Sequence, residues 1–173
     1  FQLVDIDLLS DAYADGYRTE VNLAALDWLD TVASRIDRGF LLTIDYGHTA
    51  QRYYSPARHK GTLKCYYQHR HHDNPYANIG QQDLTAHVDF TALERQGERA
   101  GLSTVGFTQQ GLFLMALGLG DRVANLAQTI TPGPNGFNQL IQSRQALHQL
   151  MDMSPMGLGT FGVLIQSKGL GNN

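Results

Sequence analysis

The feature that most constrains the fold is a mostly apolar run, residues 40–44, that ends in the carboxylate of Asp45. An apolar run of this length, bounded by glycines, predicts a strand buried on both faces, as in a parallel sheet. Ligands of open α/β sheets bind just beyond the carboxyl ends of such strands. We therefore expect Asp45, Tyr46 and His48 to emerge at a functional edge. A simple turn that begins at Asp45 fits the spacing equally well.

The pattern around this strand is that of alternating helices and strands. Asn22 suits a helix N-cap, and apolar residues recur at helical spacing from Leu23 to Ile36. After an irregular lead-in over residues 1–19, the patterns predict further elements: a helix over 91–100 capped by Asp89 or Thr91 and ended by Gly101, a strand over 102–108, a helix over 109–128 weakened at Gly118 and Gly120, a break at 131–136, a helix over 137–153 and a strand over 160–166. This succession predicts an α/β fold.

The segment from His48 to Gln82 shows no helical or strand period. It is much longer than an ordinary connection of about 4–6 residues, and such long segments are usually functional or disordered. It is also rich in tyrosine, whereas disordered segments are poor in aromatic residues. We therefore interpret residues 48–82 as an inserted, ordered loop that serves as a lid over a substrate site.

The composition limits the classes of function. The 173 residues suffice for one domain with its own core. A net charge of −3 and a pI near 6.1 give no basis for nucleic-acid binding. No apolar run approaches the roughly 20 residues that span a bilayer. A single cysteine, Cys65, excludes an internal disulfide and favours a reducing compartment. The chain opens at Phe1 in mid-pattern, as a truncated or processed protein would.

Four strings in the chain carry a resemblance to a known family: residues 20–29, 44–48, 61–69 and 83–90. The two most specific are Ile-Asp-Tyr-Gly-His at 44–48 and Asp-Leu-Thr-Ala-His-Val-Asp-Phe at 83–90. Together they resemble the MidA family of S-adenosylmethionine-dependent methyltransferases. The mitochondrial members of that family methylate an arginine of a respiratory complex I subunit during assembly.

The resemblance implies a class I, Rossmann-like methyltransferase sheet, of which residues 1–173 form the C-terminal portion of a single domain. The cofactor implied is S-adenosylmethionine, and the family's glycine-rich cofactor loop lies upstream of this chain, so no cofactor-binding residue is assigned. The partner implied is a protein substrate, in the cytoplasm or the mitochondrial matrix. A homodimer remains an open alternative.

The resemblance and the chemistry of methyl transfer together suggest roles for individual residues. Methyl transfer to a guanidinium nitrogen requires alignment above all, and a carboxylate can hold a guanidinium through two hydrogen bonds. A histidine can remove the product proton. The candidate catalytic residues are Asp45, His48 and Asp89, and the candidate substrate-binding residues are Tyr46, Gly47, His69, Thr85 and His87. Asp89 is equally suited to a helix cap.

Other motifs carry competing interpretations. Residues 157–162 spell G-x-G-x-x-G, but a helix precedes them and a strand follows, the reverse of a dinucleotide site, so a tight turn is favoured. The His-rich run 69–73 invites a zinc-dependent hydrolase, but adjacent histidines seldom converge on one metal, and no metal site is assigned. Cys65 fits a packed thiol better than a nucleophile. The main alternative function is a non-catalytic assembly or scaffolding factor with the same fold.

Overall fold

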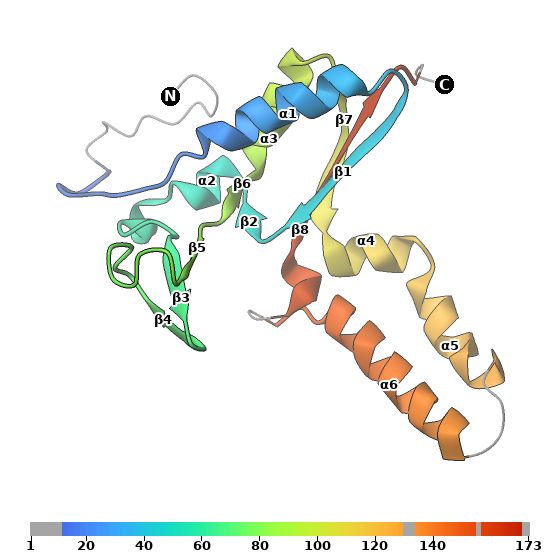
Figure 1. Cartoon of the computed structure of the whole chain (residues 1–173). Helices are drawn as coiled ribbons and strands as arrows, with labels where there is room; N and C mark the ends of the chain where they lie inside the picture. Colours follow the sequence, from blue (N-terminus) through green and yellow to red (C-terminus); the bar gives the residue numbers. More distant parts are fainter. Residues whose placement is uncertain (1–11, 130–133, 155–156, 171–173) are drawn as a thin grey trace. The chain divides into compact units, whose positions relative to one another are not determined.

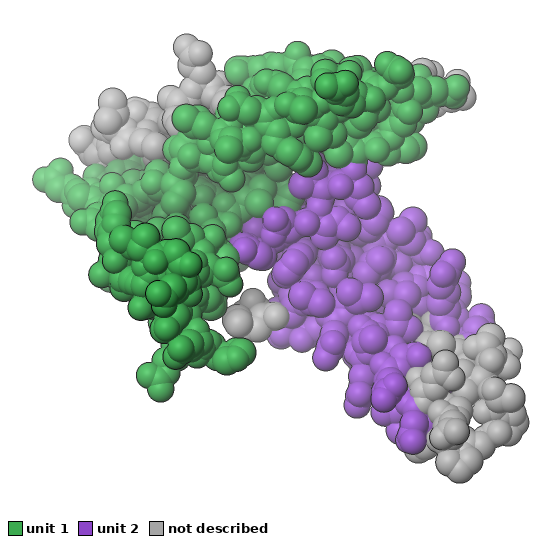
Figure 2. Space-filling view, in the orientation of Figure 1, with its two compact units in different colours: residues 1–41, 47–104, 166–173 green, residues 42–46, 105–165 purple. Residues whose placement is uncertain are grey.

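The computed structural model describes residues 12–129, 134–154 and 157–170, and it divides into two compact units (Figures 1 and 2). Unit 1 comprises residues 1–41, 47–104 and 166–173, and unit 2 comprises residues 42–46 and 105–165. The first eleven residues of the predicted lead-in lie outside the described part. Each unit is treated separately below.

Unit 1 contains the helix predicted after Asn22. Helix α1 spans Leu23–Arg35, and the Asn22 side chain caps it by accepting a hydrogen bond from the Ala25 amide at 3.0 Å. Its buried side packs against α3, Phe90–Arg99, and Leu29 and Ala33 are fully buried. The side-chain amide of Gln96 also donates a hydrogen bond to the Asp30 carboxylate at 2.7 Å, which links α3 to α1. The prediction of an amphipathic helix here is confirmed.

Helix α3 begins at a carboxylate cap. The Asp89 carboxylate accepts a hydrogen bond from the Ala92 amide at 3.1 Å, so Asp89 is the N-cap. Thr91, the alternative cap, instead accepts a hydrogen bond from the Ala50 amide at 3.0 Å. The predicted stop is confirmed as well, because the helix ends at Arg99 and Gly101 takes a left-handed φ of +82°.

The segment 48–82, predicted as an ordered loop without a helical or strand period, contains short helices and strands. It contains β2 (Gly47–His48), α2 (Ala50–Tyr53), the 3-10 turn η1 (Pro56–Arg58), β3 (Lys64–Tyr67) and β4 (Arg70–His72). Strand β3 pairs antiparallel with β4 and with β5, Asp83–Thr85, in the order β4-β3-β5. Tyr53, Tyr54 and the free thiol of Cys65 are buried. Two tyrosines of the segment are therefore packed, as the abundance of tyrosine indicated, whereas Tyr66 and Tyr76 are exposed.

A second sheet has the order β1-β8-β7, with the last strand in the centre. Strand β1 spans Gly39–Asp45, β7 spans Ser103–Gln109 and β8 spans Gly162–Lys168. The prediction that residues 40–44 are buried on both faces is wrong for this structure. Alternate side chains of β1 are exposed, with Phe40 at 64%, whereas the central strand β8 buries Val163 and Leu164. An apolar run does not by itself distinguish a strand buried on both faces from one buried on a single face.

The described part of unit 2 has two helices where one was predicted over residues 109–128, and a third that begins inside the predicted break at 131–136. Helix α4 spans Gln110–Ala116 and α5 spans Leu119–Thr129, and between them Gly118 takes a φ of +81° that ends the first helix. Helix α6 spans Pro134–Met151, beginning three residues before the predicted start. The first part of the break at 131–136 lies outside the described residues. In the part of the chain that is described, no helix is both long and apolar enough to cross a membrane.

Candidate functional site

The centre of the candidate site in unit 1 is a short parallel ladder between β2 and β6, Val88–Asp89. Gly47 lies opposite Val88 and His48 lies opposite Asp89. A Cβ atom on Gly47 would collide with the Val88 carbonyl oxygen and would lie 2.7 Å from the Phe90 ring. The ladder therefore requires glycine at position 47, and it places two candidate catalytic residues, His48 and Asp89, on neighbouring strands.

His48 and His87 form an imidazole pair in this ladder region. Their ring centroids lie 4.9 Å apart in an edge-to-face arrangement. Burial, followed by the positive charge of Arg58 and the neighbouring His87, lowers the pKa of His48 to about 4. His48 is therefore neutral at pH 7. A neutral imidazole of such low pKa can accept a hydrogen bond, but it holds a proton weakly.

This shift makes stability depend on the protonation of His48. The unfolded chain protonates this imidazole near its ordinary pKa of 6.5, whereas the folded protein does so only near 4. As the pH falls through 6.5, the proton binds the unfolded chain first, so stability declines until about pH 4 and then levels off. We expect this loss to be on the order of 1–2 kcal/mol, after allowance for solvent screening. Urea unfolding of the wild type and of His48→Gln at pH 7 and pH 4.5 measures this loss. We expect the variant to lose less stability than the wild type between the two pH values. Equal losses in both proteins would contradict the role of His48.

A partly buried hydrogen-bond network holds the backbone of His87, which lies between β5 and β6. The Thr62 hydroxyl accepts a hydrogen bond from the His87 amide at 3.0 Å and donates to the Glu20 carboxylate at 3.0 Å. Glu20 also accepts from the amides of Thr62 at 2.8 Å and Leu63 at 3.3 Å. One carboxylate thus satisfies three donors of the turn before β3. Glu20 and Thr62, which are far from His87 in the sequence, thus fix the position of its backbone.

Two tyrosines surround the other side of this network. The Tyr53 hydroxyl lies 3.4 Å from the Thr62 hydroxyl, and burial raises the pKa of Tyr53. Burial and the adjacent Asp89 carboxylate also raise the pKa of Tyr54. Burial raises the pKa of Asp89, although hydrogen bonds from the Ala92 amide and the Tyr54 hydroxyl oppose this. Asp89 is therefore a stronger base than an exposed carboxylate, while it also caps α3.

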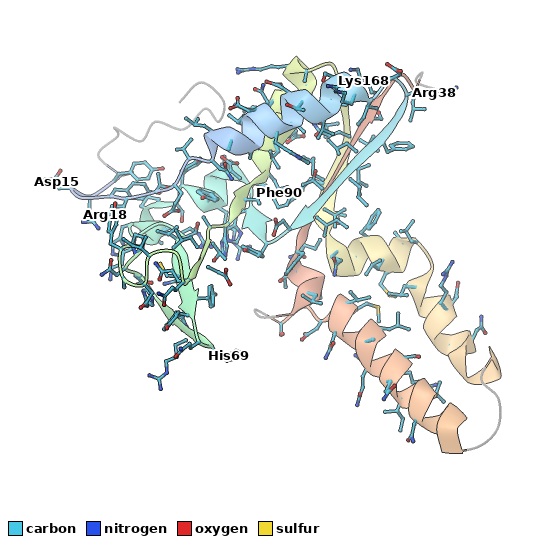
Figure 3. The ribbon with its side chains drawn as sticks, viewed as in Figure 1. Asp15, Arg18, Arg38, His69, Phe90 and Lys168 are labelled. Atoms are coloured by element: carbon cyan, nitrogen blue, oxygen red, sulfur yellow. The ribbon has the colours of Figure 1, made fainter. Side chains whose placement is uncertain are left out.

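The other candidate residues of unit 1 are not equally close to this ladder. Thr85 ends β5 and pairs with Lys64 across the small sheet, where it is half-buried. His69 lies at the exposed turn between β3 and β4, in a left-handed conformation with a φ of 62° (Figure 3). The structure thus brings Gly47, His48, His87 and Asp89 together, and it does not bring His69 to them.

Asp45 and Tyr46 belong to unit 2. Asp45 ends β1 as predicted and is half-buried, and its carboxylate accepts a hydrogen bond from the Tyr46 amide at 2.7 Å. The Tyr46 ring packs edge-on against Phe161, with ring centroids 5.8 Å apart. The strand end therefore presents a carboxylate beside an aromatic ring.

The glycine run 157–162 is a tight connection rather than a cofactor cradle. It forms the 3-10 turn η2, Leu158–Thr160, between α6 and β8. A Cβ on Gly159 would lie 2.6 Å from the Met151 carbonyl, so the glycine is packed on the end of α6. The prediction of a helix-to-strand turn is confirmed.

The remaining candidate for a metal site was the His-rich run 69–73. Among the described residues, no group of three or more His, Cys, Asp or Glu side chains could hold a metal ion. Asp73 instead forms an ion pair with Lys64 at 2.6 Å.

No role was predicted from the sequence for Glu20, Thr62, Tyr53 or Tyr54. Thr62 contacts Glu20 across 42 positions and His87 across 25 positions of sequence. No local pattern reports such contacts. The only available signal was that Glu20 and Thr62 lie within the strings that carry the family resemblance.

The comparisons with known proteins place the chain in a family. Residues 4–108 match the family described as "Putative S-adenosyl-L-methionine-dependent methyltransferase", and the chain belongs to this family. The predicted resemblance is therefore confirmed. S-adenosylmethionine is the cofactor of the family.

Three proteins show how far the similarity extends. The chain is 33% identical over 129 residues to the Drosophila melanogaster "Protein arginine methyltransferase NDUFAF7 homolog, mitochondrial", a match that covers 73% of the chain and 26% of that protein. It matches the native crystal structure of an uncharacterised Burkholderia thailandensis protein with a TM-score of 0.81 and 34% identity, over 95% of this chain and 42% of that one. A second Burkholderia thailandensis structure, bound to S-adenosyl-homocysteine, gives the same TM-score and identity over 95% and 41% of the two chains.

The mixed α/β structure is thus that of a methyltransferase-like protein, as predicted. The chain spans less than half the length of these relatives. The glycine run 157–162 packs against the end of α6 and gives no indication of a cofactor site. We therefore assign no residue of this chain to cofactor contact.

Proposed function

We propose that the protein containing this chain is an S-adenosylmethionine-dependent methyltransferase that methylates an arginine of a protein. Family membership supports the methyltransferase class, and the name of the Drosophila relative supports arginine as the acceptor. The observation that carries the proposal is the pairing of β2 with β6, because it joins the two most specific family strings, 44–48 and 83–90, through their own residues.

The proposed roles follow from the chemistry of the residues. We assign Asp45 to orienting the guanidinium, since a carboxylate can accept two parallel hydrogen bonds from it. We assign removal of the product proton to Asp89 rather than His48, because burial raises the pKa of Asp89 and lowers that of His48 to about 4. His48 is then a neutral hydrogen-bond acceptor in the site.

The remaining residues serve the substrate in this proposal. Tyr46, Thr85 and His87 line the acceptor side, Gly47 lets the strands approach, and His69 contacts the protein substrate at the exposed hairpin turn. Segment 48–82 acts as the lid, within a Rossmann-like domain whose C-terminal portion is this chain. The protein works in the cytoplasm, or in the mitochondrial matrix of a eukaryote.

Replacement of Asp45 tests the catalytic assignment. We expect Asp45→Asn in the intact protein to lower kcat for arginine methylation by about 10²-fold or more, because orientation of the nucleophile supplies much of the catalysis. Asp27→Asn is the matched control, since Asp27 is an exposed carboxylate on α1. Steady-state incorporation of labelled methyl groups measures both variants. If Asp45→Asn retains the wild-type kcat, the role assigned to Asp45 is wrong. If the wild-type protein transfers no methyl group at all, the scaffolding alternative is favoured.

A further inference from the structure

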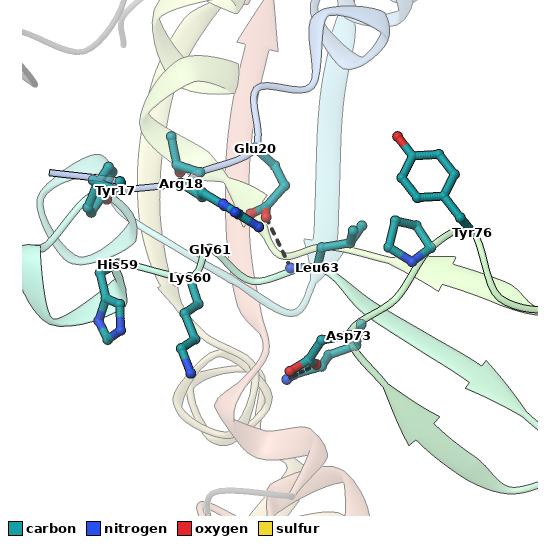
Figure 4. Close-up of a pocket in the computed structure, with 13 residues that line it drawn as sticks. Tyr17, Arg18, Glu20, His59, Lys60, Gly61, Leu63, Asp73 and Tyr76 are labelled. Carbon is teal, nitrogen blue, oxygen red and sulfur yellow. Dashed lines mark hydrogen bonds and ion pairs between the residues drawn. The ribbon is translucent and has the colours of Figure 1, made fainter.

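A pocket in unit 1 is separate from the β2–β6 ladder. It has a volume of about 1080 Å³ and lies among the stretch before α1, the turn before β3 and the turn after β4 (Figure 4). Pockets for small molecules usually measure about 300–1,000 Å³, so this one has room for a segment of polypeptide. None of the candidate catalytic or substrate-binding residues lines it.

Of the two carboxylates in the pocket lining, Asp73 is paired with a cation and Glu20 is held by neutral donors. Glu20 accepts hydrogen bonds from two backbone amides and the Thr62 hydroxyl. Asp73 forms the ion pair with Lys64, and this hydrogen bond and charge hold the pKa of Asp73 below its usual value. Lys64 therefore balances the charge of Asp73, whereas the charge of Glu20 remains and offsets only one of the two other cations of the lining.

The other two Lys and Arg residues of the lining, Arg18 and Lys60, form no ion pair within the described residues. Their backbones form an isolated parallel bridge, in which the Arg18 amide donates to the His59 carbonyl at 3.0 Å. Both side chains are exposed. Like charges on directly paired residues repel each other, so this arrangement costs stability unless an anion lies nearby. The cationic pair is notable in a chain with a net charge of −3.

The rest of the lining suits a peptide better than a small anion. Tyr17, Pro75 and Tyr76 contribute flat apolar surfaces, and Tyr76 is 82% exposed. An exposed aromatic side chain beside a cationic pair can pack on the stems of a partner's side chains while its carboxylates meet the cations.

We propose that this pocket binds an acidic segment of the protein substrate, with two or more Asp or Glu side chains paired to Arg18 and Lys60. The inference rests on the proposed function, since the acidic segment lies on the protein whose arginine is methylated. Charge complementarity here sets which protein is captured, and it acts on substrate binding rather than on the chemical step.

A peptide-binding titration tests the proposal without any methyl transfer. The probe is a fluorescein-labelled peptide of about ten residues that alternates Glu and Ser, and the reference peptide replaces each Glu with Gln. Fluorescence anisotropy with the intact protein measures the Kd of each. The test variant is Arg18→Gln/Lys60→Gln, and the control is Arg38→Gln/Arg99→Gln, which removes the same charge from exposed positions of unit 1 outside the pocket.

We expect the acidic peptide to bind about tenfold more weakly to the test variant and unchanged to the control, because two exposed ion pairs are lost. Binding should also weaken as the salt concentration rises. Equal affinity of the test variant and wild type, or equal affinity for the Gln peptide, would overturn the proposal. Displacement of the peptide by inorganic phosphate at the same molar concentration would overturn it in favour of a phosphate site.

The outcome is distinguishable from failure of the proposed function. Charge-dependent peptide binding by a protein without methyltransferase activity would overturn the proposed function and leave the pocket intact. An active enzyme whose KM for its protein substrate is unchanged in the test variant would overturn the pocket alone. A higher KM with unchanged kcat is the expected result.

Discussion

Gly47→Val should destabilise the protein by about 3 kcal/mol or more and abolish methyl transfer. A Cβ at this position collides with the Val88 carbonyl and the buried ring of Phe90, and neither group is the flexible end of a side chain. Overpacking of a rigid site forces the strands apart and breaks the ladder that places His48 opposite Asp89. Thermal and urea unfolding of the purified variant measure the effect on stability.

Gly106→Ala is the matched control for this change. Gly106 also lies in a strand, β7, and a Cβ on it meets nothing within 4 Å. We expect this control to unfold within about 0.5 kcal/mol of the wild type. If Gly47→Val were as stable as Gly106→Ala, the close approach of β2 and β6 would be contradicted.

Glu20→Ala should be the second most damaging change, with a loss of about 2–3 kcal/mol. It removes a charged acceptor from two backbone amides and the Thr62 hydroxyl, all partly buried, and these donors are then left without a partner. Gly61 packs directly against this carboxylate and has no side chain that could replace it as an acceptor. Hydrogen exchange should show faster exchange of the Thr62 and Leu63 amides.

Glu20→Gln separates the loss of the negative charge from the loss of the hydrogen-bond acceptors. Glu20→Gln keeps one acceptor oxygen but loses the charge, so we expect roughly half the destabilisation. Lost protection confined to α1 in Glu20→Ala, with the Thr62 and Leu63 amides as protected as in the wild type, would contradict the network.

Local signals in the sequence predicted the helices well. Asn22 and Asp89 cap α1 and α3, and Gly118 ends α4, since capping and left-handed glycine depend on a few neighbouring residues. The family strings likewise predicted the methyltransferase class. These features could be found because their causes are close together in the chain.

Features that depend on distant partners were missed. The small sheet β4-β3-β5 pairs Cys65 with Leu84, and the hydrophobic period of its short strands is too brief to detect. The exposure of Phe40 depends on what covers one face of β1, which its own sequence does not encode. The pKa of His48 also depends on burial and on Arg58 and His87, which only the folded structure brings near.

The most direct test of the central claim is methyl transfer to arginine by the intact protein. The purified protein is incubated with S-adenosylmethionine carrying a labelled methyl group and with the protein extract of cells that lack it, and the labelled proteins are hydrolysed to amino acids. The account predicts label in methylarginine, absent in the Asp45→Asn variant. A protein that binds S-adenosyl-homocysteine but labels no arginine, or labels another residue instead, would contradict the proposed function.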